Sequence, residues 1–298
     1  MYHPIPRNWL LATNKIEAVF RNAHGHKTGH GSGFWLRCGE DLLFATNRHV
    51  IDIEYSDPKY MGHSYALSSM QILTFDPSGS SGRQRVNRAD IATHEDPNID
   101  IALLRVSEVI NPDDISVAPA SVEVIADSHF LNTELEWGAQ ISFSSFQPWR
   151  DVQTERPILR TGILSNDPAH PFVSTKINKD HAHLLEAFSF AGSSGSPIAN
   201  AKGIKTGPEL TGGGFRPARI IGMMTGHLPN EESETGVPYR THTGLSYCHR
   251  SDLLLAMVNG VEPLQESTFV AATEVPEARG DRARAQSIGA AGADSAGS

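Results

Sequence analysis

Short apolar runs, separated by glycine, proline, asparagine and aspartate, dominate the first 260 residues of this chain. They are clearest at 32–36, 42–46, 101–106, 141–143, 157–160 and 219–224. Apolar runs of this length, bounded by turn residues, are typical of β-strands. The pattern therefore predicts an all-β protein, and we place a first strand around 18–20.

Two later segments depart from the strand pattern. Residues 251–258 open with Ser251 and Asp252 and are followed by Asn259 and Gly260, which are helix start and stop signals. We therefore predict a helix there. From about 265 to 298 the apolar pattern is lost to alanine, glycine, serine and charged residues, so we predict a disordered tail.

Composition excludes several classes of protein. The net charge of −9 argues against general nucleic-acid binding, which needs a basic face. Cys38 and Cys248 are the only cysteines, so we expect free thiols and no disulfide framework. The start of the chain lacks the pattern of a secretory leader, and no run approaches the ~20 apolar residues of a membrane span. We therefore predict a cytoplasmic protein without membrane contact.

Three polar residues stand where apolar runs begin or end. His49 follows the run at 42–46, Asp100 opens the run at 101–106, and Ser194 lies in the Gly-Ser-Ser-Gly sequence at 192–195. A base, a carboxylate and a hydroxyl in this order are the parts of a serine nucleophile and its activating pair. Asp96 is the competing carboxylate, but it lies in a polar turn, so we expect it in solvent.

The segment around Ser194 suits nucleophilic chemistry for a second reason. Glycine at 192 permits a tight turn that aims two backbone amides into one pocket, as stabilisation of an oxyanion requires. A plain glycine–serine turn without chemistry is the alternative for this segment taken alone.

Histidines outside these segments form two loose groups, His24, His26 and His30, and His181 with His183. Histidines two apart on a strand share a face and suit zinc. Neither group has a cysteine nearby, so we predict polar loops and no metal site.

The chain resembles the chymotrypsin-like (trypsin-fold) serine peptidases, especially the bacterial trypsin-like domains, over roughly residues 15–262. The resemblance is carried by Gly-Ser-Gly-Phe at 31–34, Thr-Asn-Arg-His-Val at 46–50, Asp-Ile-Ala-Leu-Leu at 100–104 and Gly-Ser-Ser-Gly-Ser-Pro at 192–197. The strand at 220–226 resembles the one that lines the substrate cleft. Ser196 departs from the family pattern, in which a second glycine follows the nucleophile.

The resemblance implies two six-stranded antiparallel β-barrels with the active site between them. The first barrel would span 1–130 with His49 and Asp100, and the second would span 131–264 with Ser194 and the C-terminal helix, leaving 265–298 as the tail. The amides of Gly192 and Ser194 would form the oxyanion hole, and Thr225 would hydrogen-bond Asp100. Residue 193 is serine, so we expect no activation by a cleaved N-terminus.

Specificity is expected to depend on a few residues near the nucleophile. Phe188 stands six residues before Ser194, where basic-specific relatives have an acid, so cleavage after Lys or Arg is not expected. Thr225, Gly226 and His227 would line the substrate site. An apolar or small P1 side chain is our first expectation, and His227 would favour an acidic or amide one.

The sequence thus predicts a serine endopeptidase that acts on protein or peptide substrates through an acyl-enzyme, without a cofactor. One alternative is a binding or sensor module of the same fold with little or no turnover. Another is a protease that stays latent until an unknown partner docks on the long loop at 200–217. An intact triad disfavours the pure binding module, which has no need of all three residues.

Overall fold

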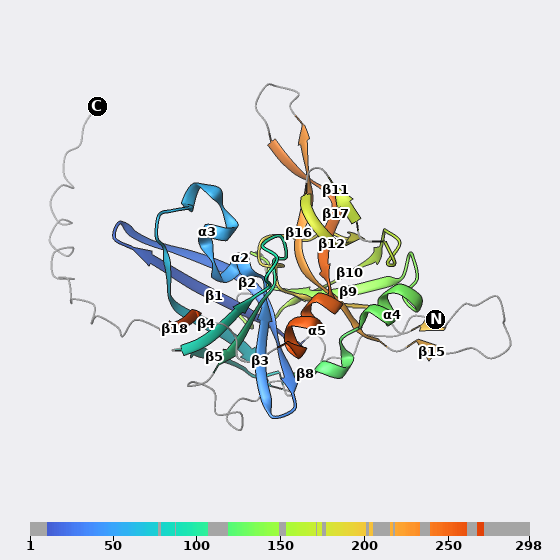
Figure 1. The fold of residues 1–298 in the computed structure, drawn as a ribbon, viewed down its shortest axis with the longest axis horizontal. Helices are drawn as coiled ribbons and strands as arrows, with labels where there is room; N and C mark the ends of the chain where they lie inside the picture. Colours follow the sequence, from blue (N-terminus) through green and yellow to red (C-terminus); the bar gives the residue numbers. More distant parts are fainter. Residues whose placement is uncertain are drawn as a thin grey trace, which may run out of the picture.

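The computed structural model describes residues 11–76, 79–86, 88–106, 119–148, 153–170, 172–174, 177–200, 203–204, 215–216, 218–232, 239–260 and 267–270. Most of these residues lie in strands, as the apolar runs predict. The strands form two large sheets, one in each half of the molecule (Figure 1).

The sheet of the N-terminal half has the order β18-β6-β7-β3-β2-β1-β4-β5, with every pairing antiparallel, and β8 pairs in parallel with β2. Its strands are β1 (Thr13–Asn22), β2 (Gly25–Cys38), β3 (Asp41–Thr46), β4 (Ala66–Phe75), β5 (Ser81–Val86), β6 (Arg88–Thr93), β7 (Ala102–Val106), β8 (Ala120–Ser121) and β18 (Ser267–Val270). The strand predicted at 18–20 lies within β1.

The sheet of the C-terminal half has the order β10-β9-β13-β16-β17-β12, and β12 pairs back to β10, which closes a six-stranded antiparallel barrel. Its strands are β9 (Gln140–Ser145), β10 (Ile158–Leu164), β12 (Ile177–Glu186), β13 (Pro197–Asn200), β16 (Ile220–Glu232) and β17 (Tyr239–Arg250), with β11 (Phe172–Ser174) added at β12. Within the loop predicted at 200–217, β14 (Gly203–Ile204) pairs with β15 (Phe215–Arg216).

The prediction of two six-stranded barrels is therefore right for one half and wrong for the other. Among the described strands of the N-terminal sheet, β5 pairs only with β4, and the outer edge of β6 is occupied by β18. Residues 267–270 thus form a strand inside the segment predicted to be disordered. The backbone groups at the outer edge of β6 are paired by β18, a segment far along the chain, and not by β5, so these strands do not close into a barrel. Residues 271–298 lie outside the described part.

The helices are short. They are α2 (Arg48–Ile51), α3 (Ile53–Ser56), α4 (Ser128–Thr133) and α5 (Ser251–Asn259), with 3₁₀ turns η1 (Pro58–Tyr60) and η2 (Val122–Val124). The helix predicted at 251–258 is α5, but Arg250 holds its N-cap position and the Ser251 hydroxyl donates to the carbonyl of Ala126 (2.7 Å). None of the helices in the described part is long and apolar enough to cross a membrane.

Apolar side chains form a large core within each half and a third large core that both halves share, and a smaller cluster also joins the halves through Phe75 and Phe146. The shared core joins Phe34 and Leu103 of the N-terminal sheet to Ile220 and Met223 of β16 and to Leu254 of α5. Helix α5 accordingly lies between the two halves in Figure 1. Burial of these side chains, at roughly 25 cal/mol per Å² of apolar surface, stabilises the junction at which the polar site residues meet. Cys38 and Cys248 are free thiols, as predicted.

Candidate active site

His49 lies in α2, directly after β3. Asn47 precedes the helix in an extended conformation, and the chain turns so that Val50 and Ile51 enter the N-terminal core. The imidazole is then left on the other side, with 26% of its side chain exposed. Burial of Val50 and Ile51 thus fixes the backbone next to His49, while the His49 side chain still reaches solvent.

Asp100 is 1% exposed, and all of its polar atoms are engaged. Its carboxylate accepts the backbone N–H of His49 at Oδ1 (2.9 Å) and contacts Nδ1 of the same residue at Oδ2 (2.6 Å). Its carbonyl accepts the Asn47 amide (2.6 Å), and its N–H donates to Nε2 of His249 (2.9 Å). A buried charge is tolerated only when it is satisfied in this way.

The contact with Asp100 sets the tautomer of His49. A carboxylate only accepts hydrogen bonds, so the ring proton is assigned to Nδ1, and Nε2 is left as an acceptor. Two nearby tyrosines respond to the same carboxylate. Burial first, and then the charge of Asp100, raise the pKa of Tyr247 to about 12, and the same two causes lead the raised pKa of Tyr55.

Ser194 follows a tight turn in which the Ser193 N–H donates to the carbonyl of Phe190 (2.8 Å). Gly192 is the third residue of this turn and has a φ of +88°, which fits a type II turn and disfavours other residues. Space excludes them as well, because a Cβ at Gly192 would lie 2.1 Å from the carbonyl oxygen of Phe146. Among the residues that the structure describes, no acceptor contacts the N–H of Gly192 or of Ser194.

Ser32 of β2 ties the N-terminal half to this turn. Its hydroxyl donates to the carbonyl of Gly192 (2.7 Å), and its N–H donates to the carbonyl of Ser194 (2.7 Å). Its own carbonyl accepts the Thr46 hydroxyl (2.8 Å), and a Cβ at Gly195 would lie 1.9 Å from that carbonyl oxygen. Sequence analysis had noted Ser32 only as part of the Gly-Ser-Gly motif and missed this role.

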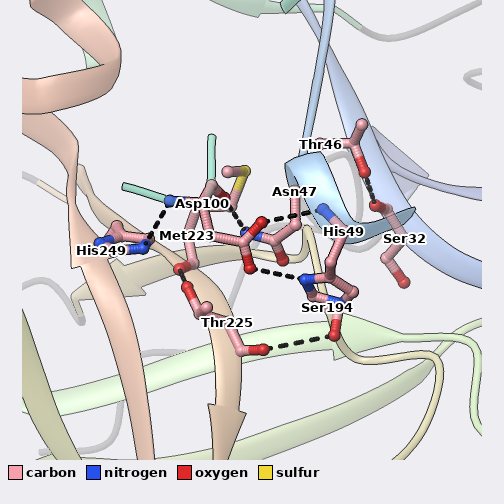
Figure 2. Close-up of polar contacts among 9 residues, drawn as sticks. All are labelled: Ser32, Thr46, Asn47, His49, Asp100, Ser194, Met223, Thr225 and His249. Atoms are coloured by element: carbon pink, nitrogen blue, oxygen red, sulfur yellow. Dashed lines mark hydrogen bonds and ion pairs between the residues drawn. The ribbon is translucent and has the colours of Figure 1, made fainter. Parts of the chain in front are cut away.

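The structure joins His49 to Asp100 directly and brings Ser194 to the same junction (Figure 2). A Cβ built at Gly31 would lie 2.6 Å from a methyl of Val50 and 3.2 Å from the carbonyl oxygen of Ser194, so the two segments flank one glycine. The Ser194 hydroxyl donates to the carbonyl of Thr225 at 3.4 Å. No hydrogen bond joins it to His49 in the described part of the chain. Such contacts are often long or misaligned without substrate.

A cavity of about 470 Å³ opens beside Ser194. Thr225, Gly226 and His227, the residues predicted to bind substrate, lie on its wall together with Ser189, Phe190, Ala191, Ser193, Met224, Pro229 and Tyr247. The Thr225 hydroxyl donates to the carbonyl of Met223 (3.2 Å), so the predicted bond to Asp100 is wrong.

Phe188 does not line this cavity. It is 50% exposed, lines a neighbouring hollow of about 770 Å³, and packs at a tilt on the His242 ring (4.8 Å between ring centroids). The chain has left β12, which ends at Glu186, and Ser189, 2% exposed, lines the cavity instead.

Two histidines and an arginine lie on or near the wall of the cavity. His227 on the wall stacks on His242 at 4.5 Å, and Arg160 lies over the ring of Phe190 at 4.7 Å. Burial lowers the pKa of His227, and burial together with His227 lowers the pKa of His242 to about 4. None of the residues described as lining the cavity is acidic, and no group of three or more potential metal ligands gathers in the described part.

Comparison with solved structures finds distant likenesses to this chain. No family model matches the chain, and no curated protein matches it. A solved structure described as "Crystal structure of Deg5" is 16% identical, with 84% of this chain and 88% of that chain covered and a TM-score of 0.48. The functional argument therefore depends on the geometry of the site.

Proposed function

We propose that this protein is a serine endopeptidase of the chymotrypsin-like kind, with Ser194 as nucleophile, His49 as base and Asp100 as its orienting carboxylate. The observation that carries the proposal is the Asp100–His49 pair. A buried carboxylate with both oxygens engaged contacts one nitrogen of an imidazole that is 26% exposed, and this arrangement suits proton transfer better than a structural ion pair at a surface does.

In the proposed mechanism, the Ser194 hydroxyl rotates away from the carbonyl of Thr225 and gives its proton to Nε2 of His49 as the oxygen attacks the peptide carbonyl. Asp100 stabilises the imidazolium that forms. The N–H groups of Gly192 and Ser194 have no acceptor in the described part, so they serve the oxyanion. His49 then protonates the leaving amine, and water releases the acyl group by the reverse sequence.

The cavity beside Ser194 supports a P1 side chain other than lysine or arginine, because no carboxylate is present among its described lining residues. Phe190, Met224, Pro229 and Tyr247 give its wall an apolar character that suits an apolar or small side chain. His227 offers an imidazole contact on that wall, and an acidic or amide side chain would use it.

Hydrolysis of a denatured, dye-labelled protein tests the proposal. The wild-type chain should release peptides, and Ser194→Ala should abolish release. Ser165→Ala is the matched control, since this serine lies in the same half and its buried hydroxyl has no hydrogen-bond partner in the described residues. Equal rates for wild type and Ser194→Ala would refute the proposal.

A latent enzyme is the second candidate, and the bond between the Ser194 hydroxyl and Thr225 favours it. In that state the nucleophile would turn toward His49 only when substrate or a partner binds. Reaction with a fluorophosphonate separates the candidates. Full labelling of the isolated chain excludes latency. Absence of labelling in folded protein excludes an enzyme that is active by itself, and it is expected of a latent enzyme and of a binding or sensor module alike.

A further inference from the structure

His249 lies on β17, in the half that carries Ser194, yet it contacts the half that carries Asp100. Its ring is 0% exposed, and its Nε2 accepts the backbone N–H of Asp100 at 2.9 Å, across 149 positions of sequence. Figure 2 shows this bond on the side of Asp100 opposite to His49. The position of His249 is itself fixed, because its backbone pairs with Met223 of β16 and Ala182 of β12.

Asp100 needs such a partner because it stands outside the strand ladder. β7 begins at Ala102, so the N–H and the carbonyl of Asp100 lack the strand partners that the next residues have. Two side chains replace them, Asn47 at the carbonyl and His249 at the N–H. Asn47 belongs to the same half as Asp100, so of these two bonds only the one from His249 ties Asp100 to the half that supplies the nucleophile.

This bond also constrains the chemistry of the ring. Nε2 accepts a hydrogen bond, so it carries no proton, and the proton of the neutral ring sits on Nδ1. A replacement without an acceptor would leave the buried N–H of Asp100 unpaired, and the backbone would shift to relieve it. The carboxylate would move with the backbone, and with it the imidazole of His49.

We propose that His249 is a positioning residue that fixes the Asp100–His49 pair relative to Ser194 across the junction of the two halves. The inference rests on the proposed function for its kinetic consequences, but the geometry that it predicts can be measured without turnover.

Two substitutions at His249 test the proposal. His249→Phe keeps a flat ring and removes the acceptor, whereas His249→Gln keeps an acceptor oxygen near the place of Nε2. We expect His249→Phe to lower kcat up to about 100-fold with KM nearly unchanged, since a displacement of about 1 Å has that effect on a reacting pair. His249→Gln should recover most of the loss. If His249→Phe does not fold, His249→Leu takes its place.

His183→Phe is the matched control. His183 lies on β12, is also 0% exposed and pairs with Cys248, the residue before His249. Its ring nitrogens have no hydrogen-bond partner in the described part of the chain. The His183 ring does not hold Asp100. We therefore expect His183→Phe, which also removes a buried histidine from this region, to keep the wild-type kcat.

Proton NMR of the Nδ1–H of His49 gives a readout that does not need activity. The resonance should move in His249→Phe, return toward its wild-type position in His249→Gln and stay in place in His183→Phe. If the wild type proves inactive but the resonance behaves in this way, the proposed function fails and the positioning role stands. A folded His249→Phe variant with wild-type kcat and an unmoved resonance overturns the positioning role, as does equal loss in the Phe and Gln variants.

Discussion

At the scale of single residues, the site depends on satisfying a buried charge. The carboxylate of Asp100 would be costly to bury at 1% exposure without hydrogen-bonding contacts, and its two oxygens both contact His49. The same contacts that stabilise the carboxylate therefore orient the imidazole. Stability and positioning of the pair have one physical cause here.

Substitution of Asp100 by asparagine keeps the shape of the side chain but removes its charge and changes the tautomer of His49 that it favours. The amide can donate to Nδ1 of His49, which would move the ring proton to Nε2 and block acceptance from Ser194. By the behaviour of such triads, we expect kcat to fall about 10⁴-fold with little change in fold. Asp96→Asn is the control. Its Oδ1 accepts the N–H of Asn98 within a turn, so its kcat should stay at the wild-type value. Similar kcat values for the two variants would remove Asp100 from the mechanism.

Gly192→Ala tests the turn before the nucleophile. Gly192 has a positive φ, and a Cβ there would lie 2.1 Å from the carbonyl oxygen of Phe146. The turn must therefore open in the variant, and the N–H groups of Gly192 and Ser194 would no longer point to the same place. We expect loss of fluorophosphonate labelling and a lower melting temperature. Gly62→Ala is the control, because Gly62 has a φ of +77° with nothing within 4 Å of a Cβ. It should show strain alone, with labelling retained.

At the scale of secondary-structure elements, the sequence pattern predicts those strands and helices that depend on interactions between residues close in sequence. The strands next to the three site residues, and α5, follow from apolar runs and turn residues. The N-cap of α5 was misplaced by one residue, because the Ser251 hydroxyl bonds to Ala126 far away in sequence. Placement of Phe188 also failed, because this residue lies beyond the end of β12, where no strand alternation fixes the side on which a side chain lies.

Contacts between distant segments account for what the sequence could not predict. The bonds from Ser32 to Gly192 and from His249 to Asp100 span 160 and 149 positions. No local pattern marks either partner. No local pattern marks β18 either, because its four residues form a strand by pairing with the distant β6. The motifs therefore indicate the candidate site, whereas the residues that hold it in place, Ser32 and His249, are found only from the structure.

Removal of β18 tests its contribution. A chain ending at 262 would expose the edge of β6, which pairs with β18 from Arg88 to Ile91. We expect the free energy of unfolding to fall by roughly 1–3 kcal/mol, as for a few lost hydrogen bonds, with kcat retained. A chain that ends at 270 keeps the strand and serves as control. Identical denaturant midpoints for the two truncations would show that β18 adds nothing to stability.

At the scale of the whole molecule, buried histidines make stability depend on pH. Burial first, and then the positive charge of Arg250, lower the pKa of His183 to about 3, against 6.5 in an unfolded chain. Above pH 6.5 both states are neutral at this residue. As the pH falls toward 3 the unfolded chain binds the proton first, so the folded state loses stability.

The free energy of unfolding should therefore fall with pH below 6.5, by at most about 1.4 kcal/mol per unit from His183. Chemical denaturation at a series of pH values measures this slope. His183→Phe removes the titrating group, so its curve should be flatter between pH 6 and pH 4. Parallel curves for wild type and variant would show that His183 does not contribute.

The two halves meet through shared apolar clusters and through hydrogen bonds that the N-terminal half donates, from Ser32 to the Ser194 turn and from Asp100 to His249. The central claim is that this junction makes Ser194 a nucleophile. Labelling of the folded chain with a fluorophosphonate, followed by peptide mass spectrometry, tests it most directly. We predict one adduct per chain, on Ser194, that is lost in Ser194→Ala and strongly reduced in His49→Ala. An adduct on another residue, or no adduct on Ser194 in the folded chain, would contradict the claim.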